Sequence, residues 1–327
     1  MDSPPVSCHP SPHQVLWDRY LSSVEKIVWT TLEIVRARVA PHTSSPLHHW
    51  NSHPGALLLP SSPSPATTFT AIISTSPNLT LTSSSPIFRL IRAVSESSSV
   101  ASIVVVWSSV VRPPPLQDWV RLGRLAPGTP LTIAPPSTSS ISPRFHAASE
   151  APTEAVLCLE EDVSLTTSEV DFALEVWRNF QDRLVGFPAR GHWWDETRRR
   201  WRFDSRWTNE YSVVLTTAAF LHRRLAALFL TALPPALAAP RPACEHLLIN
   251  FLAAHLTRLP PVKVTQRRVV RAGGREEWRG VQACMTQFVE GFGYMPLVRS
   301  QVRLDPVLFK DPVSNMRKKY RRMELVQ

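Results

Sequence analysis

AVLCLEEDVSL, residues 155–165, passes from five apolar residues directly into three acids, Glu160, Glu161 and Asp162. A short apolar run of this kind predicts a buried β-strand. Three neighbouring carboxylates repel one another, so a strand that ends on them needs a partner there. A divalent cation is one such partner, because hard cations bind carboxylate oxygens. The alternatives are that one acid caps the next helix, or that the acids face water.

The segments around this strand alternate between short apolar runs and helical patterns. Because buried strands that alternate with helices form parallel sheets, we expect an α/β fold with a mixed, mostly parallel sheet flanked by helices. In such a sheet, ligands bind beyond the carboxyl ends of the strands, which is where the three acids lie. Further strands are predicted at 69–75, 102–109 and 130–135, and helices at 86–97 and 166–180, the latter with a capping box of Thr166 and Glu169.

The N-terminal part has a different composition. Residues 1–65 are rich in Pro, Ser and His around one helical pattern at 15–39, and PSSPSPATT at 60–68 reads as a linker. We therefore predict an N-terminal segment at 1–65 and one α/β domain at 66–327. No stretch reaches the roughly 20 apolar residues of a membrane span, and residues 1–14 lack the basic-then-apolar order of a signal peptide.

The chain is basic, with a formal net charge of +10 and a pI of about 10.1. This charge favours nucleic acid, anionic lipid or a sulfated glycan as partner, or it is only a basic surface. RRRWRFDSRW at 198–207 interleaves arginine with tryptophan. Such a segment suits single-stranded nucleic acid or a uronate-containing glycan, whose carboxylates match guanidinium geometry. It is otherwise a surface loop with Trp201 and Trp207 packed inward.

Several segments together resemble the C-terminal, family 64 glycosyltransferase domain of the exostosins. They are VLCLEED at 156–162, WTNEYSVVLTTAAFLHRR at 207–224, INFLAAHLTRLPPVKVT at 249–265 and FGYMPLVRSQVRLDPVLFKDPVSNMRKKYRRME at 292–324. The resemblance implies a GT-A type fold and a UDP-sugar-dependent, retaining α-N-acetylglucosaminyl transferase of heparan sulfate biosynthesis. The alternative is a catalytically degenerate homologue that acts as partner or scaffold of an active exostosin.

The resemblance also implies cofactors, partners and a location. A manganese ion would be held by an acidic motif that aligns with residues 160–162. The donor would be UDP-N-acetylglucosamine or a related UDP-sugar, and the acceptor a heparan sulfate precursor glycan. Another exostosin subunit is a possible partner, and nucleic acid is not expected. The family is placed in the lumen of the endoplasmic reticulum and Golgi.

Site residues follow from the positions that match the family. Glu160 and Asp162 are the implied metal ligands, and Cys244 and Cys284 the implied disulfide. The implied donor-binding residues are Ser108, Arg144, Glu160, Glu161 and Asp162. The implied catalytic residues are Glu245 and His246, and the acceptor-side candidates are His192, Trp193 and Asn209.

The chain departs from the family at four positions. Glu160 stands where the family has aspartate, so its carboxylate is displaced by one methylene. His246 replaces an acid, and a neutral imidazole cannot stabilise a positive anomeric centre as a carboxylate does. Val281 stands where the family has an arginine, and Arg279, two residues earlier, could take the role of that arginine. Ser108 replaces an asparagine. Together these changes predict reduced or absent chemistry, although His246 could instead fill only a structural position at the helix end.

Overall fold

The computed structural model describes residues 67–77, 79, 81–109, 112–134, 142–204, 210–231, 233, 237, 242–266 and 280–306. The predicted N-terminal segment at 1–65 lies outside these residues, so the proposed division of the chain at residue 66 stays a prediction. Trp207, Asn209 and Arg279 also lie outside them.

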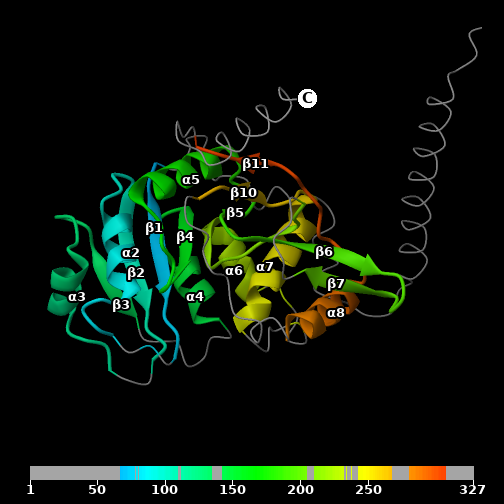
Figure 1. Cartoon of the computed structure of the whole chain (residues 1–327), viewed down its shortest axis with the longest axis horizontal. Coiled ribbons are helices and arrows are strands. Elements are labelled where there is room, and N and C mark those ends of the chain that lie inside the picture. The colour runs from blue at the N-terminus through cyan, green and yellow to red at the C-terminus, as the bar shows by residue number, and fades with distance from the viewer. Residues whose placement is uncertain are drawn as a thin grey trace, which may run out of the picture. The chain divides into compact units, whose positions relative to one another are not determined.

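An eight-stranded sheet forms the centre of the described domain (Figure 1). Its strand order is β11-β10-β5-β9-β4-β1-β2-β3, and neighbouring strands run parallel except beside β9, which is antiparallel to both β4 and β5. This confirms the predicted mixed, mostly parallel sheet. The strands are β1 Phe69–Ser74, β2 Val100–Val106, β3 Leu131–Ala134, β4 Ala155–Glu160, β5 Val185–Gly186, β9 Ala218–His222, β10 Val262–Val264 and β11 Arg303–Leu304.

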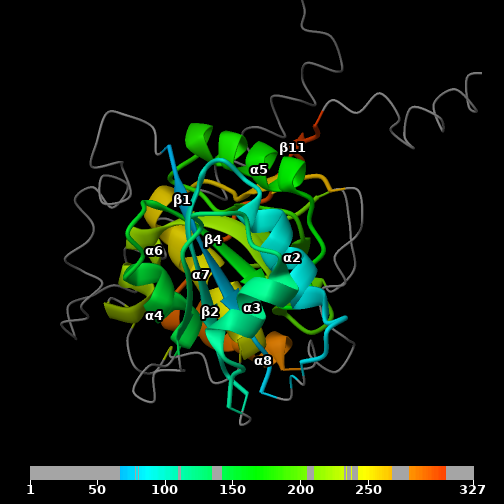
Figure 2. The same cartoon turned by 90° about the vertical axis from the view of Figure 1, so that its left-hand side faces the viewer.

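Helices cover both faces of the sheet, as Figure 2 shows with α4 and α6 on one side and α2 on the other. The inner strands are buried on both faces because their apolar side chains alternate between two hydrophobic clusters. In β1, for example, Ile72 packs into one cluster, and Ala71 and Ile73 pack into the other. The first cluster includes residues of α4 Pro143–Ser149, α6 Arg223–Thr231, α7 Pro242–Thr257 and α8 Val281–Phe292, and the second those of α2 Pro86–Ser95, α3 Leu116–Gly123 and α5 Thr167–Asn179.

Helix α5 begins as its sequence predicts. The Thr166 hydroxyl accepts the backbone N–H of Glu169, and the Glu169 carboxylate accepts the backbone N–H of Thr166 at 2.8 Å, which completes the capping box. The cap satisfies two backbone donors that would otherwise lack a partner, and it fixes the start of α5 just after the acidic stretch. The inward face of α5 is formed by Val170, Ala173, Leu174 and Trp177, which are all buried.

A second, three-stranded sheet lies beside the large one. It has the order β7-β6-β8, with β6 at Ala189–Asp195, β7 at Arg200–Asp204 and β8 at Val213–Val214. Strands β6 and β7 form an antiparallel hairpin that projects from the domain (Figure 1). The expectation of a loop is therefore wrong for Arg200–Asp204, because this segment pairs along its length with β6. Trp201 does turn inward, and it packs against His192 and Trp194 with ring centroids at 5.2 and 5.3 Å.

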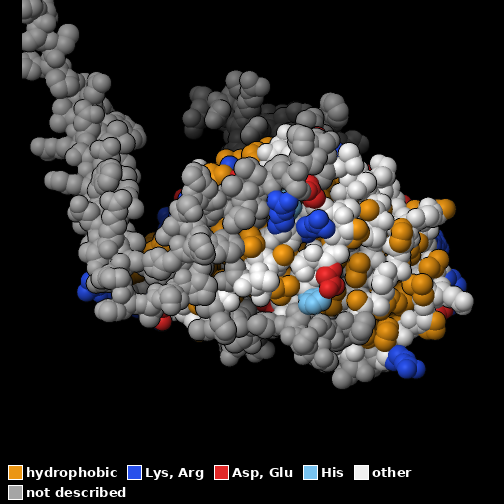
Figure 3. All heavy atoms as spheres, turned by 180° about the vertical axis from the view of Figure 1, so that it is seen from behind, with side chains coloured by type: hydrophobic (Ala, Val, Ile, Leu, Met, Phe, Trp, Pro, Cys, Tyr) orange, Lys and Arg blue, Asp and Glu red, His pale blue; other side chains and the backbone are white. Residues whose placement is uncertain are grey.

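The surface seen in Figure 3 shows how the described charges are distributed on one face. Lys and Arg side chains are scattered there among uncharged and acidic side chains. On this face, the described residues therefore do not gather the positive charge into one continuous basic patch. Within the described part of the chain, no helix is long and apolar enough to cross a membrane.

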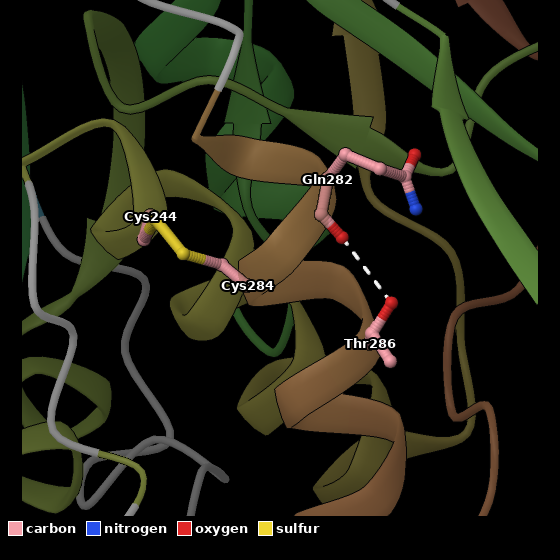
Figure 4. The surroundings of a disulfide bond; sticks show 4 residues. All are labelled: Cys244, Gln282, Cys284 and Thr286. Carbon is pink, nitrogen blue, oxygen red and sulfur yellow. Dashed lines mark hydrogen bonds between the residues drawn. A yellow bond between two sulfur atoms is a disulfide. The ribbon is translucent and has the colours of Figure 1, made fainter.

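The expected disulfide is present between Cys244 of α7 and Cys284 of α8. Figure 4 shows that Gln282, on the same helix as Cys284, points away from this bridge. Its side chain accepts the backbone N–H of Phe203 at 3.0 Å and donates to the carbonyl of Trp201 at 2.7 Å. Helix α8 is therefore fixed to α7 on one side and to the hairpin strand β7 on the other.

Candidate active site

The predicted acids lie at the carboxyl edge of the sheet, where β1, β2 and β4 end side by side. Three hydrogen bonds join the loops that follow these strands. The backbone N–H of Ser108, after β2, donates to the Thr75 hydroxyl at 2.8 Å. Ser76, after β1, donates its backbone N–H and its hydroxyl to the two oxygens of Glu161, both at 2.6 Å. The structure thus brings Ser108 and residues 160–162 to one edge.

Four side chains form a closed ring of contacts behind this edge. Arg144 donates to Glu160 at 3.1 Å and to the Thr216 hydroxyl at 3.2 Å. His246 lies 2.7 Å from that hydroxyl through Nδ1 and 3.4 Å from the same Glu160 oxygen through Nε2. One tautomer satisfies all contacts at once: Thr216 donates to Nδ1, and Nε2–H donates to Glu160.

The ring keeps Glu160 ionised. Burial on its own would raise the pKa of Glu160, but the hydrogen bond from His246 and the charge of Arg144 outweigh it and hold the pKa at about 2. Burial disfavours the charge of Arg144 in the same way, yet the carboxylates of Glu160 and Glu245 raise its pKa. The pair is therefore a charged one, with the Arg144 side chain 10% exposed and that of Glu160 26% exposed.

Glu245 is the second carboxylate close to Arg144. It lies one residue before His246 on α7, is 7% exposed, and accepts a hydrogen bond from the Ser142 hydroxyl at 2.9 Å. Burial raises its pKa, while Arg144 and Ser142 act in the opposite direction. Of the two predicted catalytic residues, Glu245 is thus held by Ser142 and His246 by Thr216.

Asp162 is the member of the acidic trio with the most exposed side chain. Partial burial and the charge of Glu160 raise its pKa, and burial also raises that of Glu161. Among the residues that the structure describes, no group of three or more His, Cys, Asp or Glu side chains is arranged to hold a metal ion. One or two carboxylates are enough, however, for a divalent ion that is shared with substrate phosphates. The carboxylates at this edge therefore fit a cation that binds together with a diphosphate. That Glu160 and Asp162 are the ligands of this cation stays a prediction.

The acceptor-side candidates lie apart from this ring. His192 and Trp193, on β6, line a separate cavity that also includes Tyr211 and Arg299. His192 contacts the Ser212 hydroxyl through Nδ1 at 2.6 Å. Burial and the charge of Arg299 lower its pKa to about 4, so the imidazole is neutral at pH 7.

Sequence reasoning missed three side chains that hold the candidate active site together: Ser76, Ser142 and Thr216. Thr216 and Ser142 are buried, and each binds a residue that is distant in sequence. The only signal was their position next to predicted elements, Thr216 just before a buried strand and Ser142 just before a short helix. Val281, the position of the lost arginine, is fully buried at the start of α8.

This fold and edge cluster define the class of α/β proteins that bind a ligand at the carboxyl ends of parallel strands. The family model described as "Glycosyl transferase family 64 domain" matches residues 69–309. The chain belongs to glycosyl transferase family 64, and it is a glycosyltransferase by class.

Curated relatives agree with this assignment. The chain is 41% identical over 354 residues to Exostosin-1 of Drosophila melanogaster and 43% identical over 347 residues to Exostosin-1c of Danio rerio. Each match covers 96% of this chain and 46% of the relative, so the chain spans about half the length of the curated relatives it matches. Among solved structures, that of GalNAc-T7 with UDP, GalNAc and Mn²⁺ is similar at a TM-score of 0.40 and 11% identity, over 57% of this chain and 40% of that one. A similarity at this level carries no argument.

Proposed function

We propose that the chain is a UDP-sugar-dependent, retaining glycosyltransferase that transfers α-N-acetylglucosamine in heparan sulfate biosynthesis. The observation that carries this proposal is the anionic cluster at the carboxyl edge of β4, with Arg144 bound against it at 3.1 Å. Membership of family 64 and the relatives named Exostosin-1 support the same reading.

The donor side would be formed by the loops that follow β1, β2 and β4. Ser76 and Ser108 are already fixed there by hydrogen bonds, so the loops need little ordering when a nucleotide binds. Asp162, with Glu160 behind it, would hold a manganese ion shared with the diphosphate. When bound, such an ion neutralises phosphate charge and acts as a Lewis acid toward the leaving group.

The catalytic candidates are Glu245 and His246. Glu245 supplies a buried carboxylate with a raised pKa, suited to holding a proton beside the reacting sugar. His246 orients Glu160 through Nε2 and is itself oriented by Thr216. Arg144 interacts electrostatically with both Glu160 and Glu245 and balances their negative charge.

Thermal unfolding with UDP tests the donor site, since a ligand that binds only the folded state stabilises it. UDP at 100 times its Kd should add about 2.7 kcal/mol, which raises the Tm by roughly 5–10 °C for a domain of this size. Manganese should increase the shift, and Asp162→Asn should remove that increase. The matched control is Asp118→Asn, on the remote helix α3, which should leave both shifts unchanged. No shift at millimolar UDP would refute the proposal.

A second candidate function is a degenerate homologue that keeps the fold and UDP binding and acts as partner of an active exostosin. The specific observation in its favour is His246, whose two ring nitrogens are both engaged, by Thr216 and Glu160. A transfer assay with UDP-N-acetylglucosamine and a heparan sulfate precursor separates the two readings. UDP binding without transfer selects the degenerate homologue, and pull-down of an exostosin subunit then tests its role as partner.

We further propose that the catalytic domain spans 66–327 and works in the lumen of the endoplasmic reticulum or Golgi. The Cys244–Cys284 disulfide supports this location, because disulfides persist in oxidising compartments. Alkylation of thiols in freshly lysed cells tests it. Modification of both cysteines without prior reduction would contradict a lumenal setting.

A further inference from the structure

A cavity of about 230 Å³ lies beside the β6–β7 hairpin, away from the ring of Arg144 and Glu160. This volume is smaller than the roughly 300–1,000 Å³ of clefts that hold drug-sized ligands, so it offers room for one ring of a chain-like ligand. Its lining combines two aromatic side chains with several polar ones: His192, Trp193, Asp204, Glu210, Tyr211 and Arg299.

Trp193 offers an apolar face in this cavity. It is 43% exposed, which is unusual for so large an apolar side chain. Arg202, directly opposite on β7, places its guanidinium 5.7 Å from the Trp193 ring centroid and so limits the motion of the indole. A fixed, exposed aromatic ring suits the apolar C–H face of a pyranose, which loses little entropy on stacking against it.

The charges around the cavity already balance one another. Arg299 lies 3.8 Å from Glu210, and Arg190 interacts electrostatically with Asp204. The guanidinium of Arg202 is 3.9 Å from Asp195. Since each of these arginines faces a carboxylate of the chain, a second carboxylate from a ligand would compete with the first. Sugar hydroxyl groups, in contrast, would donate hydrogen bonds to Asp204 and Glu210.

The cavity is close to the candidate active site along the chain. Ser212, which contacts His192, is four residues before Thr216, which contacts His246. Four residues span at most about 14 Å even when fully extended. Asn250 of α7 fixes the segment between them, because its side chain bonds both the N–H and the carbonyl of Val214 and also donates to the carbonyl of His246. Ser212 and Thr216 are therefore no farther apart than the length of a short saccharide.

We propose that this cavity is a subsite for one uncharged pyranose of the acceptor saccharide, stacked on Trp193 and hydrogen-bonded to Asp204 and Glu210. The inference rests on the proposed function for the identity of the saccharide as acceptor. It adds a preference that the function does not contain: the cavity selects the neutral sugar of an alternating chain over the uronate.

Calorimetric titration of the full chain without UDP tests the proposal. The probes are a tetrasaccharide of alternating glucuronate and N-acetylglucosamine, and the same tetrasaccharide with its carboxylates reduced to alcohols. The uronate form also carries neutral N-acetylglucosamine and should bind through Trp193, but the reduced form, in which every pyranose is neutral, should bind at least as tightly. Trp193→Ala should weaken its binding at least tenfold, and Asp204→Asn several-fold. The matched control is Trp194→Ala, on the same strand and 38% exposed but not part of the cavity lining, which should change binding less than twofold.

Three results would overturn the proposal: binding of neither probe, tighter binding of the uronate form, or unchanged binding by Trp193→Ala. Thermal unfolding of each variant with UDP separates this inference from the proposed function. If UDP stabilises the chain but one of these three saccharide results is found, only the subsite is refuted. If UDP does not stabilise the chain while the neutral saccharide binds through Trp193, only the proposed transferase activity is refuted.

Discussion

Removal of the Cys244–Cys284 bridge should produce a large and calculable loss of stability. The cysteines are separated by 40 residues, and for a loop of that length the chain-entropy relation gives about 4 kcal/mol at 25 °C. The bridge joins α7 to α8, and the residue after Cys244 is Glu245 of the candidate active site. The double variant Cys244→Ala with Cys284→Ala should therefore unfold at a much lower denaturant concentration than the wild type.

Urea unfolding followed by tryptophan fluorescence measures this loss, since the chain has 11 tryptophans. With an m-value of about 3 kcal/mol/M, a loss of about 4 kcal/mol lowers the midpoint by roughly 1.3 M. Reduced wild type should behave like the double variant, because in both the unfolded chain is no longer cross-linked. UDP binding by the folded double variant should persist, since neither sulfur contacts the ring of Arg144 and Glu160.

Cys158→Ala is the matched control, because Cys158 is a buried cysteine without a disulfide. The stability that Cys158→Ala loses measures the effect of removing a buried sulfur alone. If the double variant loses no more than twice the Cys158→Ala value, the cross-link contributes nothing and the reasoning from loop length is refuted.

Three other predictions concern buried charge. Arg144→Met should lower stability by about 3–5 kcal/mol because it leaves Glu160 buried without its partner, and adding Glu160→Gln should recover much of that loss in urea unfolding; no recovery would contradict the pairing. Burial and nearby arginines lower the pKa of His222 to about 4, so the unfolded chain binds the proton more tightly and stability should fall as the pH drops from 6.5 to 4. His222 is 2% exposed, so its contribution is about 3 kcal/mol at most, and His222→Gln should flatten this part of the pH profile. Glu160→Asp and His246→Asp should each destabilise the chain, and the double variant should depart from additivity by at least about 1 kcal/mol because the side chains touch; additivity within about 0.5 kcal/mol would show that they do not interact.

The sheet was predictable because its strands carry a local signal. Apolar runs at β1, β2 and β4 are buried on both faces, and such runs are visible in a single sequence. The two-residue strands β5, β8 and β11 were not predictable, since two residues have no periodicity. In β7, Arg200–Asp204, charged and aromatic residues do alternate, but the segment was interpreted as a ligand-binding segment or a surface loop and not as a strand.

The candidate active site was predictable only in part, for a different reason. The acids at 160–162 follow a strand, so their place at the carboxyl edge of the sheet followed from the topology. The partners of Glu160 could not be predicted from the topology. Arg144, Thr216 and His246 come from three other segments and meet only in the folded chain. The disulfide pairing came from the resemblance alone, as no local pattern selects Cys284 for Cys244.

The two departures at positions 160 and 246 are best understood together. Together with the changes at 108 and 281 they were expected to reduce or abolish the chemistry, Glu160 because it is longer than aspartate and His246 because it lacks a carboxylate. In the fold they are partners, with Nε2 of His246 3.4 Å from the Glu160 oxygen that Arg144 also binds. An aspartate at 246 would place a second negative charge beside Glu160, whereas histidine donates a hydrogen bond to it, and the extra methylene of glutamate lets its carboxylate reach both donors. The ring therefore still pairs one ionised acid, Glu160, with one guanidinium, Arg144, although two of its side chains differ from those of the family. Whether the site can transfer a sugar then depends on Glu245, the other carboxylate that interacts with Arg144.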